Sequence, residues 1–150
     1  MWLPKYAENP IYMILADFAK RMDLEILYKE LSFFPDNVLA YIDVYPLEDK
    51  YHKYIFMPID DSKICDAGKD PIHVLAHEMT HYLIENYYIN DKLVNTTTSY
   101  PLRLMLENDC DRMGLALVLL AESISEKEEE KKRRSLIFGH IEHIEAAGSP

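Results

Sequence analysis

The stretch that decides the fold is Asp70 to Asn90, DPIHVLAHEMTHYLIENYYIN, because it contains an H-E-x-x-H sequence at His77 to His81. Asp70 can cap a helix with its carboxylate, and Pro71 suits the first helical position, where a missing backbone N–H costs nothing. The stretch therefore predicts a helix that begins at Pro71 and carries the whole H-E-x-x-H sequence.

The two histidines of this sequence are spaced to bind one metal ion. In a helix, His77 and His81 lie one turn apart on nearly the same face, so their imidazoles can converge on a zinc ion at about 2.0–2.1 Å. Glu78 projects from the neighbouring face, where its carboxylate can take a proton from a water molecule on the metal. With six His and fourteen Glu in 150 residues, roughly 0.02 chance matches are expected, which favours a metal site over coincidence.

The composition predicts one globular domain, residues 1–150, and argues against several classes of function. The chain is 49% hydrophobic and 28% charged, with a formal charge of −10, and this acidity argues against a nucleic-acid-binding surface. Charged residues interrupt the opening residues 1–23, which therefore lack a signal-peptide core. The longest apolar run, residues 113–121, is far shorter than the ~20 residues that span a bilayer. With only two cysteines and no C-x-x-C pair, we expect a cytoplasmic protein with no membrane partner.

Secondary-structure signals surround the metal motif. Asn9 and Pro10 repeat the cap-and-proline start, which predicts a first helix over residues 10–22. Residues 60–69, which include Gly68, are expected to form a loop before the metal-motif helix. Residues 24–31 are predicted to form a strand, although their pattern also fits a helix. Residues 38–45 and 51–58 are rich in β-branched or aromatic residues and are predicted to form a hairpin, joined by a polar connection at 46–50.

Two further helices are predicted after the metal-motif helix. Pro101 begins the first of these helices, which is predicted over residues 102–123. Gly114 inside this helix lowers helix stability by about 1 kcal/mol relative to Ala, so its presence indicates close approach of another backbone. Ser125 followed by Glu128 forms a capping box, which predicts a separate C-terminal helix over residues 126–147. An apolar stripe on this last helix is expected to pack on the same domain, with binding to a partner as the alternative. The stripe consists of Leu136, Ile137, Ile141 and Ile144.

A catalytic zinc site normally has three protein ligands and one open position, so a third ligand is needed. Glu85 and His73 lie on the same helix as the histidine pair, too far along its axis in either direction. Glu107 is the best candidate, because helix 102–123 can turn back antiparallel to the metal-motif helix. Asp111, one turn later, could accept the N–H of a ligand imidazole and fix its tautomer. The alternative is that both acids are ordinary surface residues.

Together these motifs resemble the ImmA/IrrE-type zinc metallopeptidases, whose pattern is A-H-E-x-G-H followed by E-x-E-A-[DN]-x-F-A. The resemblance is carried by Leu75 to His81 and by Glu107 to Ala116, and it extends over roughly residues 10–121. The chain departs from the family pattern at Thr80, at Asp109-Cys110, at Met113-Gly114, and after Leu120, where a common proline is absent.

The resemblance implies a zincin-like α+β fold: an N-terminal helix, a small antiparallel or mixed β-sheet with a hairpin, the H-E-x-x-H helix, a second ligand-bearing helix and a C-terminal helix. It also implies a gluzincin-like site, in which His77, His81 and Glu107 bind Zn²⁺ and Glu78 activates water. Such enzymes are typically cytoplasmic and act on repressor-type regulators of phages, mobile elements or stress responses.

Two functions therefore remain open. The first is a zinc metallopeptidase that hydrolyses a protein or peptide substrate, which could pair with strand 51–58 if that strand is an edge. The alternative is a regulatory protein that keeps the zincin fold and metal, hydrolyses little, and acts by binding a partner through its C-terminal helix. A purely structural zinc site is less favoured, because such sites close the fourth position with Cys or His.

Overall fold

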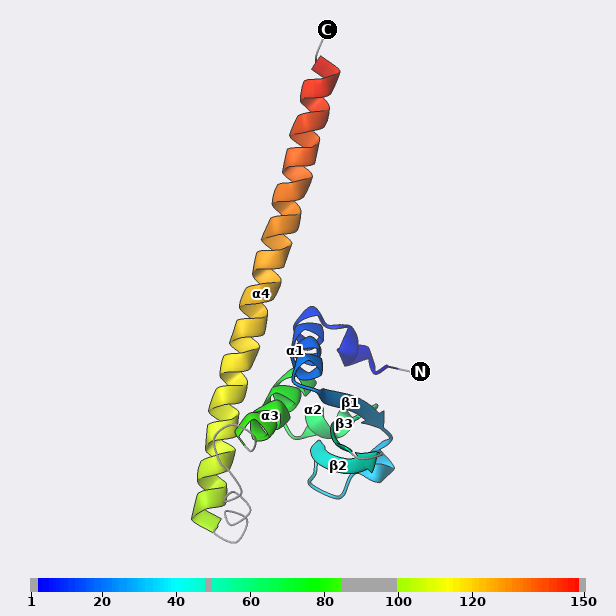
Figure 1. The fold of residues 1–150 in the computed structure, drawn as a ribbon, viewed down its shortest axis with the longest axis vertical. Coiled ribbons are helices and arrows are strands. Elements are labelled where there is room, and N and C mark those ends of the chain that lie inside the picture. Colours follow the sequence, from blue (N-terminus) through cyan, green and yellow to red (C-terminus); the bar gives the residue numbers. More distant parts are fainter. Residues whose placement is uncertain (1–2, 48–49, 85–99, 149–150) are drawn as a thin grey trace.

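The computed structural model describes residues 3–47, 50–84 and 100–148, and it has an α+β architecture from which one long helix extends (Figure 1). No helix in these described ranges combines the length and the apolar character needed to cross a bilayer. The elements, in order, are η1 (Lys5–Glu8), α1 (Pro10–Arg21), β1 (Leu24–Lys29), η2 (Leu31–Phe33), β2 (Tyr41–Leu47), β3 (Lys50–Pro58), α2 (Ser62–Asp66), α3 (Pro71–Leu83) and α4 (Tyr100–Gly148).

The first helix begins where the sequence predicts. The Asn9 side chain accepts hydrogen bonds from the backbone N–H of Ile11 and Tyr12, at 2.9 and 3.4 Å. Asp23 then adopts a left-handed backbone conformation, with φ 58°, which Asp tolerates better than most residues. This turn leads from α1 directly into β1, so the choice of strand over helix for this segment is confirmed.

Three strands form a mixed sheet in the order β1-β3-β2. The predicted hairpin is confirmed, because β2 and β3 pair in antiparallel fashion from Tyr41 opposite Phe56 to Leu47 opposite Lys50. The polar connection expected at 46–50 is wrong in its extent, since Pro46, Leu47 and Lys50 belong to the strands. β1 runs parallel to β3 on its other side. β3 is therefore the central strand, so the condition under which strand 51–58 could pair with a substrate is not met, and the edges of this sheet are β1 and β2.

The hydrophobic core joins the sheet to α1, α3 and the first half of α4. Both α1 and α3 turn an apolar face inward, and β3 contributes side chains because it is the central strand. The fully buried core side chains include Tyr12, Leu15, Leu24, Ile55, Met57, Ile64, Leu75, Met79 and Val118. We call these packed elements, η1 to α3 together with residues 104–121 of α4, the body.

Residues 60–69 are not the plain loop that the sequence predicts, because they contain the short helix α2. The Asp60 side chain accepts a hydrogen bond from the Ser62 backbone N–H at 2.9 Å, which orders the approach to this helix. Ile64 is fully buried and anchors α2 to the core. Gly68 then leaves α2 with φ 72°, a left-handed conformation for which glycine is suited.

α4 is one continuous helix of 49 residues, so the expected break before residue 126 is wrong. Ser125 lies inside the helix and does not cap it. Neither Gly nor Pro occurs between residues 115 and 138, and opposite charges one turn apart support the helix. Arg134 Nη2, for example, lies 2.8 Å from Glu130 Oε1.

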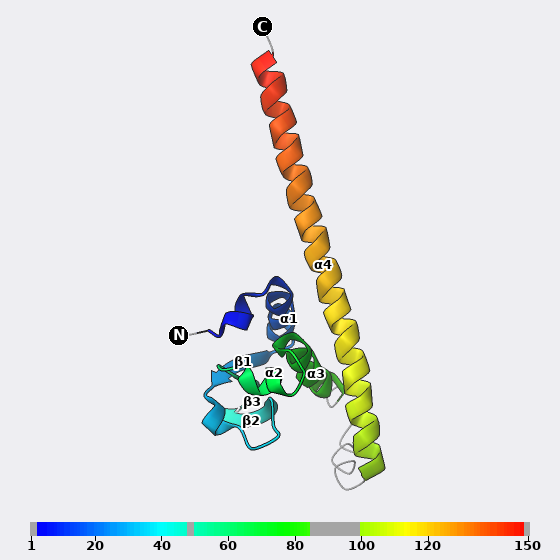
Figure 2. The same cartoon turned by 180° about the vertical axis from the view of Figure 1, so that it is seen from behind.

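The distal half of α4 extends away from the body, as both views of the molecule show (Figures 1 and 2). Leu136 is 74% exposed and Ile137 is 58% exposed. The expectation that the apolar stripe packs on the same domain is therefore wrong for these two residues, because the body does not reach that far along the helix. Ile141 and Ile144 lie outside the side chains that the structure describes.

Gly114 lies at the closest approach of α4 to α3. A Cβ atom at this position would lie 3.2 Å from the His77 backbone nitrogen and 3.4 Å from the Ala76 carbonyl carbon. The backbone contact that the sequence predicts for Gly114 is confirmed. Because the contact is with His77 itself, Gly114 sets the distance between the two helices at the metal motif.

We expect Gly114→Val to lower the free energy of unfolding by about 1–3 kcal/mol, because the larger side chain must push α4 away from α3. Urea denaturation followed by circular dichroism measures the change. Gly139→Val is the matched control, since a Cβ at Gly139 meets nothing within 4 Å, and it should change stability by less than about 0.5 kcal/mol. Equal effects of the two substitutions would contradict the close packing at Gly114.

Candidate metal centre

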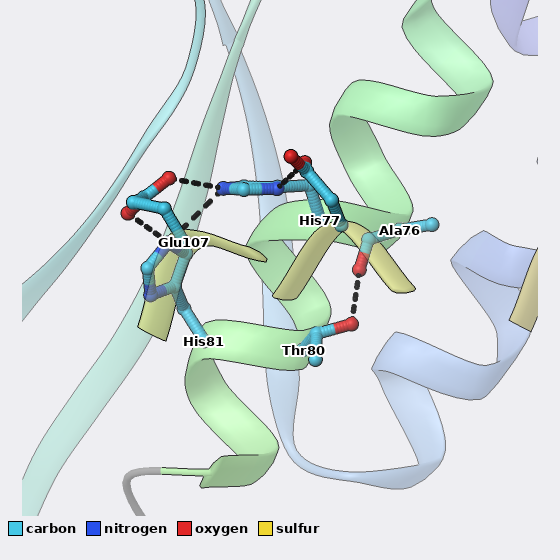
Figure 3. Close-up of polar contacts among 6 residues, drawn as sticks. Ala76, His77, Thr80, His81 and Glu107 are labelled. Atoms are coloured by element: carbon cyan, nitrogen blue, oxygen red, sulfur yellow. Dashed lines mark hydrogen bonds and ion pairs between the residues drawn. The ribbon is translucent and has the colours of Figure 1, made fainter. Parts of the chain in front are cut away.

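The structure brings the side chains of His77 and His81 from α3 together with Glu107 from α4 (Figure 3). His77 Nε2 lies 3.0 Å from one carboxylate oxygen of Glu107, and His81 Nε2 lies 2.9 Å from the other. The two Nε2 atoms are 3.1 Å apart. With one ligand atom taken from each residue, the three atoms lie within 4.8 Å of one another, and this group could hold a metal ion.

Local sequence explains why these three side chains meet. Asp70 accepts a hydrogen bond from the His73 backbone N–H at 3.0 Å, which fixes the start of α3 as predicted. The four-residue spacing then places both imidazoles on one face of α3. Glu107 lies seven residues before Gly114, two turns along α4, and so shares the face that Gly114 brings against α3.

The donor set, two imidazole nitrogens and one carboxylate, is compatible with a metal ion. His77 Nδ1 lies 2.8 Å from Asp111 Oδ1, so this nitrogen carries a proton that it donates to the carboxylate. In the neutral ring, Nε2 then directs a lone pair toward Glu107, and two acceptors 3.0 Å apart repel each other unless a cation or proton lies between them. Tetrahedral zinc with bonds of about 2.0–2.1 Å would hold adjacent ligands about 3.3 Å apart. The candidate ligand atoms lie within 4.8 Å of one another, which is compatible with a metal ion.

Asp111 occupies the place that the sequence predicts for an acid beside a ligand imidazole. Its contact with His77 fixes which ring nitrogen faces the potential metal position. Glu107 and Asp111 do lie at the surface, as the alternative interpretation predicted, because their side chains are 53% and 66% exposed. Exposure and contact with the histidines occur together here, because the site lies at the rim of the body.

A cavity of ≈ 270 Å³ is lined by two of the three candidate ligands, His77 and Glu107. His77, Glu78 and Glu107 form part of its wall, so Glu78 borders the space next to the potential metal position. The opposite wall is formed by residues 37–40, which lead into β2, and Lys69 lines the cavity near α3. A substrate in this cavity would therefore contact Glu78 and the metal position together.

Sequence reasoning missed the contribution of residues 37–40 and of Lys69 to this cavity. Asn37 adopts a left-handed conformation, with φ 69°, which turns the chain toward α3. The sequence marks Pro35 to Asn37 only as a break between strands. The position of residues 37–40 beside α3 depends on the order of strands in the sheet, and no local sequence signal reveals that order.

His73 does not join the metal group. It is exposed, and its Nδ1 atom lies 2.6 Å from Asp70 Oδ2, which agrees with its interpretation as a satisfied helix residue. Glu85, the other residue considered on this helix, lies outside the described residues.

Thr80, where the ImmA/IrrE pattern has glycine, is accommodated inside the body. Its side chain is fully buried, and its hydroxyl donates a hydrogen bond to the Ala76 carbonyl oxygen at 2.8 Å. In Figure 3 this hydroxyl points toward Ala76 and away from His81 and Glu107. The departure from the family pattern therefore leaves the geometry of the candidate ligands intact.

Cys110 is fully buried on α4 close to the metal group. Burial, together with the nearby carboxylates of Glu107 and Glu78, raises the pKa of its thiol to about 12. The thiol is therefore protonated at neutral pH.

We expect Cys110 to resist iodoacetamide in the folded protein at neutral pH and to react fully after denaturation, because its thiol is both buried and protonated. Cys65 is exposed and serves as the internal control, although its pKa is also raised. Peptide mass spectrometry of the labelled chain distinguishes the two sites. Rapid labelling of Cys110 in the folded protein would contradict its burial.

Comparisons with protein-family models, with curated proteins and with solved structures gave no match. The resemblance to ImmA/IrrE-type enzymes thus rests on the quoted motifs alone. What the structure shows is an α+β chain in which His77, His81 and Glu107 form a group compatible with a metal ion.

Proposed function

We propose that the protein is a zinc-dependent metallopeptidase with a zincin-like fold. His77, His81 and Glu107 are its zinc ligands, and Glu78 is its general base. The observation that carries this proposal is the convergence of two imidazole nitrogens and one carboxylate beside a cavity whose wall contains Glu78. An open position facing a cavity is typical of catalytic rather than structural zinc sites.

The roles of the chain's own residues follow from their positions. A bound zinc ion supplies a Lewis acid that polarises a carbonyl group and lowers the pKa of a coordinated water toward ~7. The Glu78 carboxylate accepts a proton from the attacking water and delivers it to the leaving amine nitrogen. Asp111 holds the Nδ1 proton of His77, which keeps Nε2 unprotonated and directed at the metal.

The substrate is a polypeptide in this account. β2 is an edge strand, and the cavity wall at residues 37–40 leads directly into it, so an extended peptide can pair along β2 while a side chain enters the cavity. This edge replaces strand 51–58 as the substrate-binding strand. The ImmA/IrrE resemblance favours a transcriptional regulator as the natural substrate, and the net charge of −10 argues against direct binding of nucleic acid.

Removal of the metal should abolish hydrolysis. We expect the purified protein to generate new N-termini in a library of peptides from a bacterial lysate, to lose this activity in 1,10-phenanthroline, and to regain it with one equivalent of zinc after the chelator is removed. Mass spectrometry of labelled N-termini provides the measurement. Cleavage that persists in the fully metal-free protein would refute the proposal.

The second candidate function is that of a regulatory protein with little hydrolytic activity, which the exposed distal half of α4 favours. Co-expression of wild type or Glu78→Gln with a candidate regulator separates the two functions. Cleavage by wild type alone supports the peptidase. If both proteins leave the regulator intact but retain it on affinity purification, the binding function replaces the peptidase.

A further inference from the structure

The distal half of α4 is an exposed helix that extends beyond the body. Within the described part of this region, side chains 126–139 are all exposed, and the helix stands apart from the body (Figure 2). Isolated helices of this kind need either many internal ion pairs or a partner. The pattern of charged and apolar residues identifies what that partner is.

Apolar residues recur on α4 at an interval that keeps them on one face. Leu119 and Leu120 are 55% and 50% exposed, and Ile137 and Phe138 are 58% and 64% exposed. Each residue of the first pair lies 18 positions before its counterpart in the second, which is five full helical turns. The buried residues of α4 lie on the opposite side of the helix and contact the body; they include Cys110, Gly114, Val118 and Ala121.

Between these two apolar pairs, the same face carries polar and charged residues at alternating intervals of three and four, the spacing but not the apolar composition of a coiled-coil seam. Glu130 and Arg134 on this seam already form an ion pair within the chain, with side chains 54% and 70% exposed. The seam residues are Leu120, Ser123, Lys127, Glu130, Arg134 and Ile137.

Two of the seam charges, Lys127 and Glu130, are complementary to each other in an antiparallel pair, in which Arg134 lies opposite Ser123. About a two-fold axis between residues 128 and 129, an antiparallel copy places Lys127 opposite Glu130 and Leu120 opposite Ile137 of the second chain. A parallel copy in register instead places Lys127, Glu130 and Arg134 each opposite its own like charge, which is unfavourable.

We propose that two copies of this chain pair through α4 as an antiparallel, two-fold symmetric dimer, with Leu120, Lys127, Glu130 and Ile137 in the seam. The apolar layers lie at the two ends and the charged layers lie in the middle. Because the seam faces away from the body, the α4 helix of the second chain can dock without displacing the body. In the resulting dimer, each body lies beside the distal half of the other chain's α4. The dimer does not depend on the proposed peptidase activity.

Sedimentation equilibrium of the full chain over a range of concentrations tests the apolar layer. We expect a monomer–dimer equilibrium in which Ile137→Glu raises the dimer dissociation constant at least about tenfold, because a carboxylate then faces Leu120. Leu136→Glu is the matched control: Leu136 is more exposed, at 74%, but lies outside the seam, and its substitution should change the constant less than about twofold. A monomeric wild type, or equal effects of the two substitutions, overturns the proposal.

Charge exchange tests the antiparallel register. Lys127→Glu alone and Glu130→Lys alone should each weaken self-association, because each places like charges opposite one another. An equimolar mixture of the two variants should form heterodimers in native mass spectrometry, since every cross-chain pair is again of opposite sign. Circular dichroism verifies that both variants keep their helix content. If the mixture forms no more dimer than the separate variants, this register is wrong.

Discussion

We expect that replacement of Glu107 by alanine removes most of the zinc from the purified protein. Wild-type protein should contain about one zinc ion per chain. The Glu107→Ala substitution should lower the affinity for zinc by more than ~100-fold, which exceeds the loss caused by removing a residue that only hydrogen-bonds a metal ligand. The physical reason is that Glu107 is the proposed ligand from α4 and the carboxylate of the group His77, His81 and Glu107. Inductively coupled plasma mass spectrometry after dialysis measures the metal content.

Two further substitutions on α4 sharpen this test. Asp109→Ala is the matched control, because Asp109 is an exposed acid two residues away on the other side of the helix, and it should retain full zinc. Asp111→Asn should give an intermediate loss of about 10–100-fold in affinity, since it disturbs only the orientation of His77. Full metal in Glu107→Ala would exclude Glu107 from the site.

We expect the Glu78→Gln variant to keep its zinc and to lose hydrolysis. Glutamine has nearly the same shape as glutamate but cannot accept the proton of the attacking water, so kcat should fall by about 10²–10⁴-fold. The metal content should stay at the wild-type level, because Glu78 lies on the cavity wall and outside the ligand group. Hydrolysis of a peptide identified in the library experiment provides the rate.

The control for this variant is Glu128→Gln, the same chemical change at an exposed position on α4, which should hydrolyse at the wild-type rate. Loss of zinc in Glu78→Gln would mean that Glu78 binds the metal, and an unchanged kcat would mean that another group is the base. Since Glu107→Ala acts through the metal and Glu78→Gln acts without changing it, the two variants separate metal binding from proton transfer.

The parts of this molecule that sequence could predict are those decided by local chemistry. Asp70 and Pro71 fix the start of α3, and the spacing of its two histidines fixes their common face. Gly114 indicates a close backbone contact because a mid-helix glycine is otherwise unfavourable. Glu107 and the histidines are 26 or more residues apart, yet the requirement for a third ligand was enough to single out the acid that the structure brings to them.

The parts that sequence could not predict depend on which elements pack together. The capping-box pattern at Ser125 to Glu128 is locally sound, but continuation of the helix satisfies the same backbone groups and adds ion pairs such as Glu130–Arg134. Strand 51–58 became central rather than peripheral because β1 adds to it from the far side. The apolar residues near Ile137 recur at the spacing typical of a buried helix face. This spacing does not reveal whether the surface that covers the face belongs to the same chain or to another one.

The position of zinc in the protein tests the central claim most directly. We predict that crystals of the purified protein, measured on both sides of the zinc absorption edge, show one anomalous peak about 2.0–2.2 Å from His77 Nε2, His81 Nε2 and a Glu107 carboxylate oxygen. The same maps should show Glu78 beside the open coordination position. Zinc bound elsewhere, or no zinc at this group in protein that was supplied with the metal, would contradict the account.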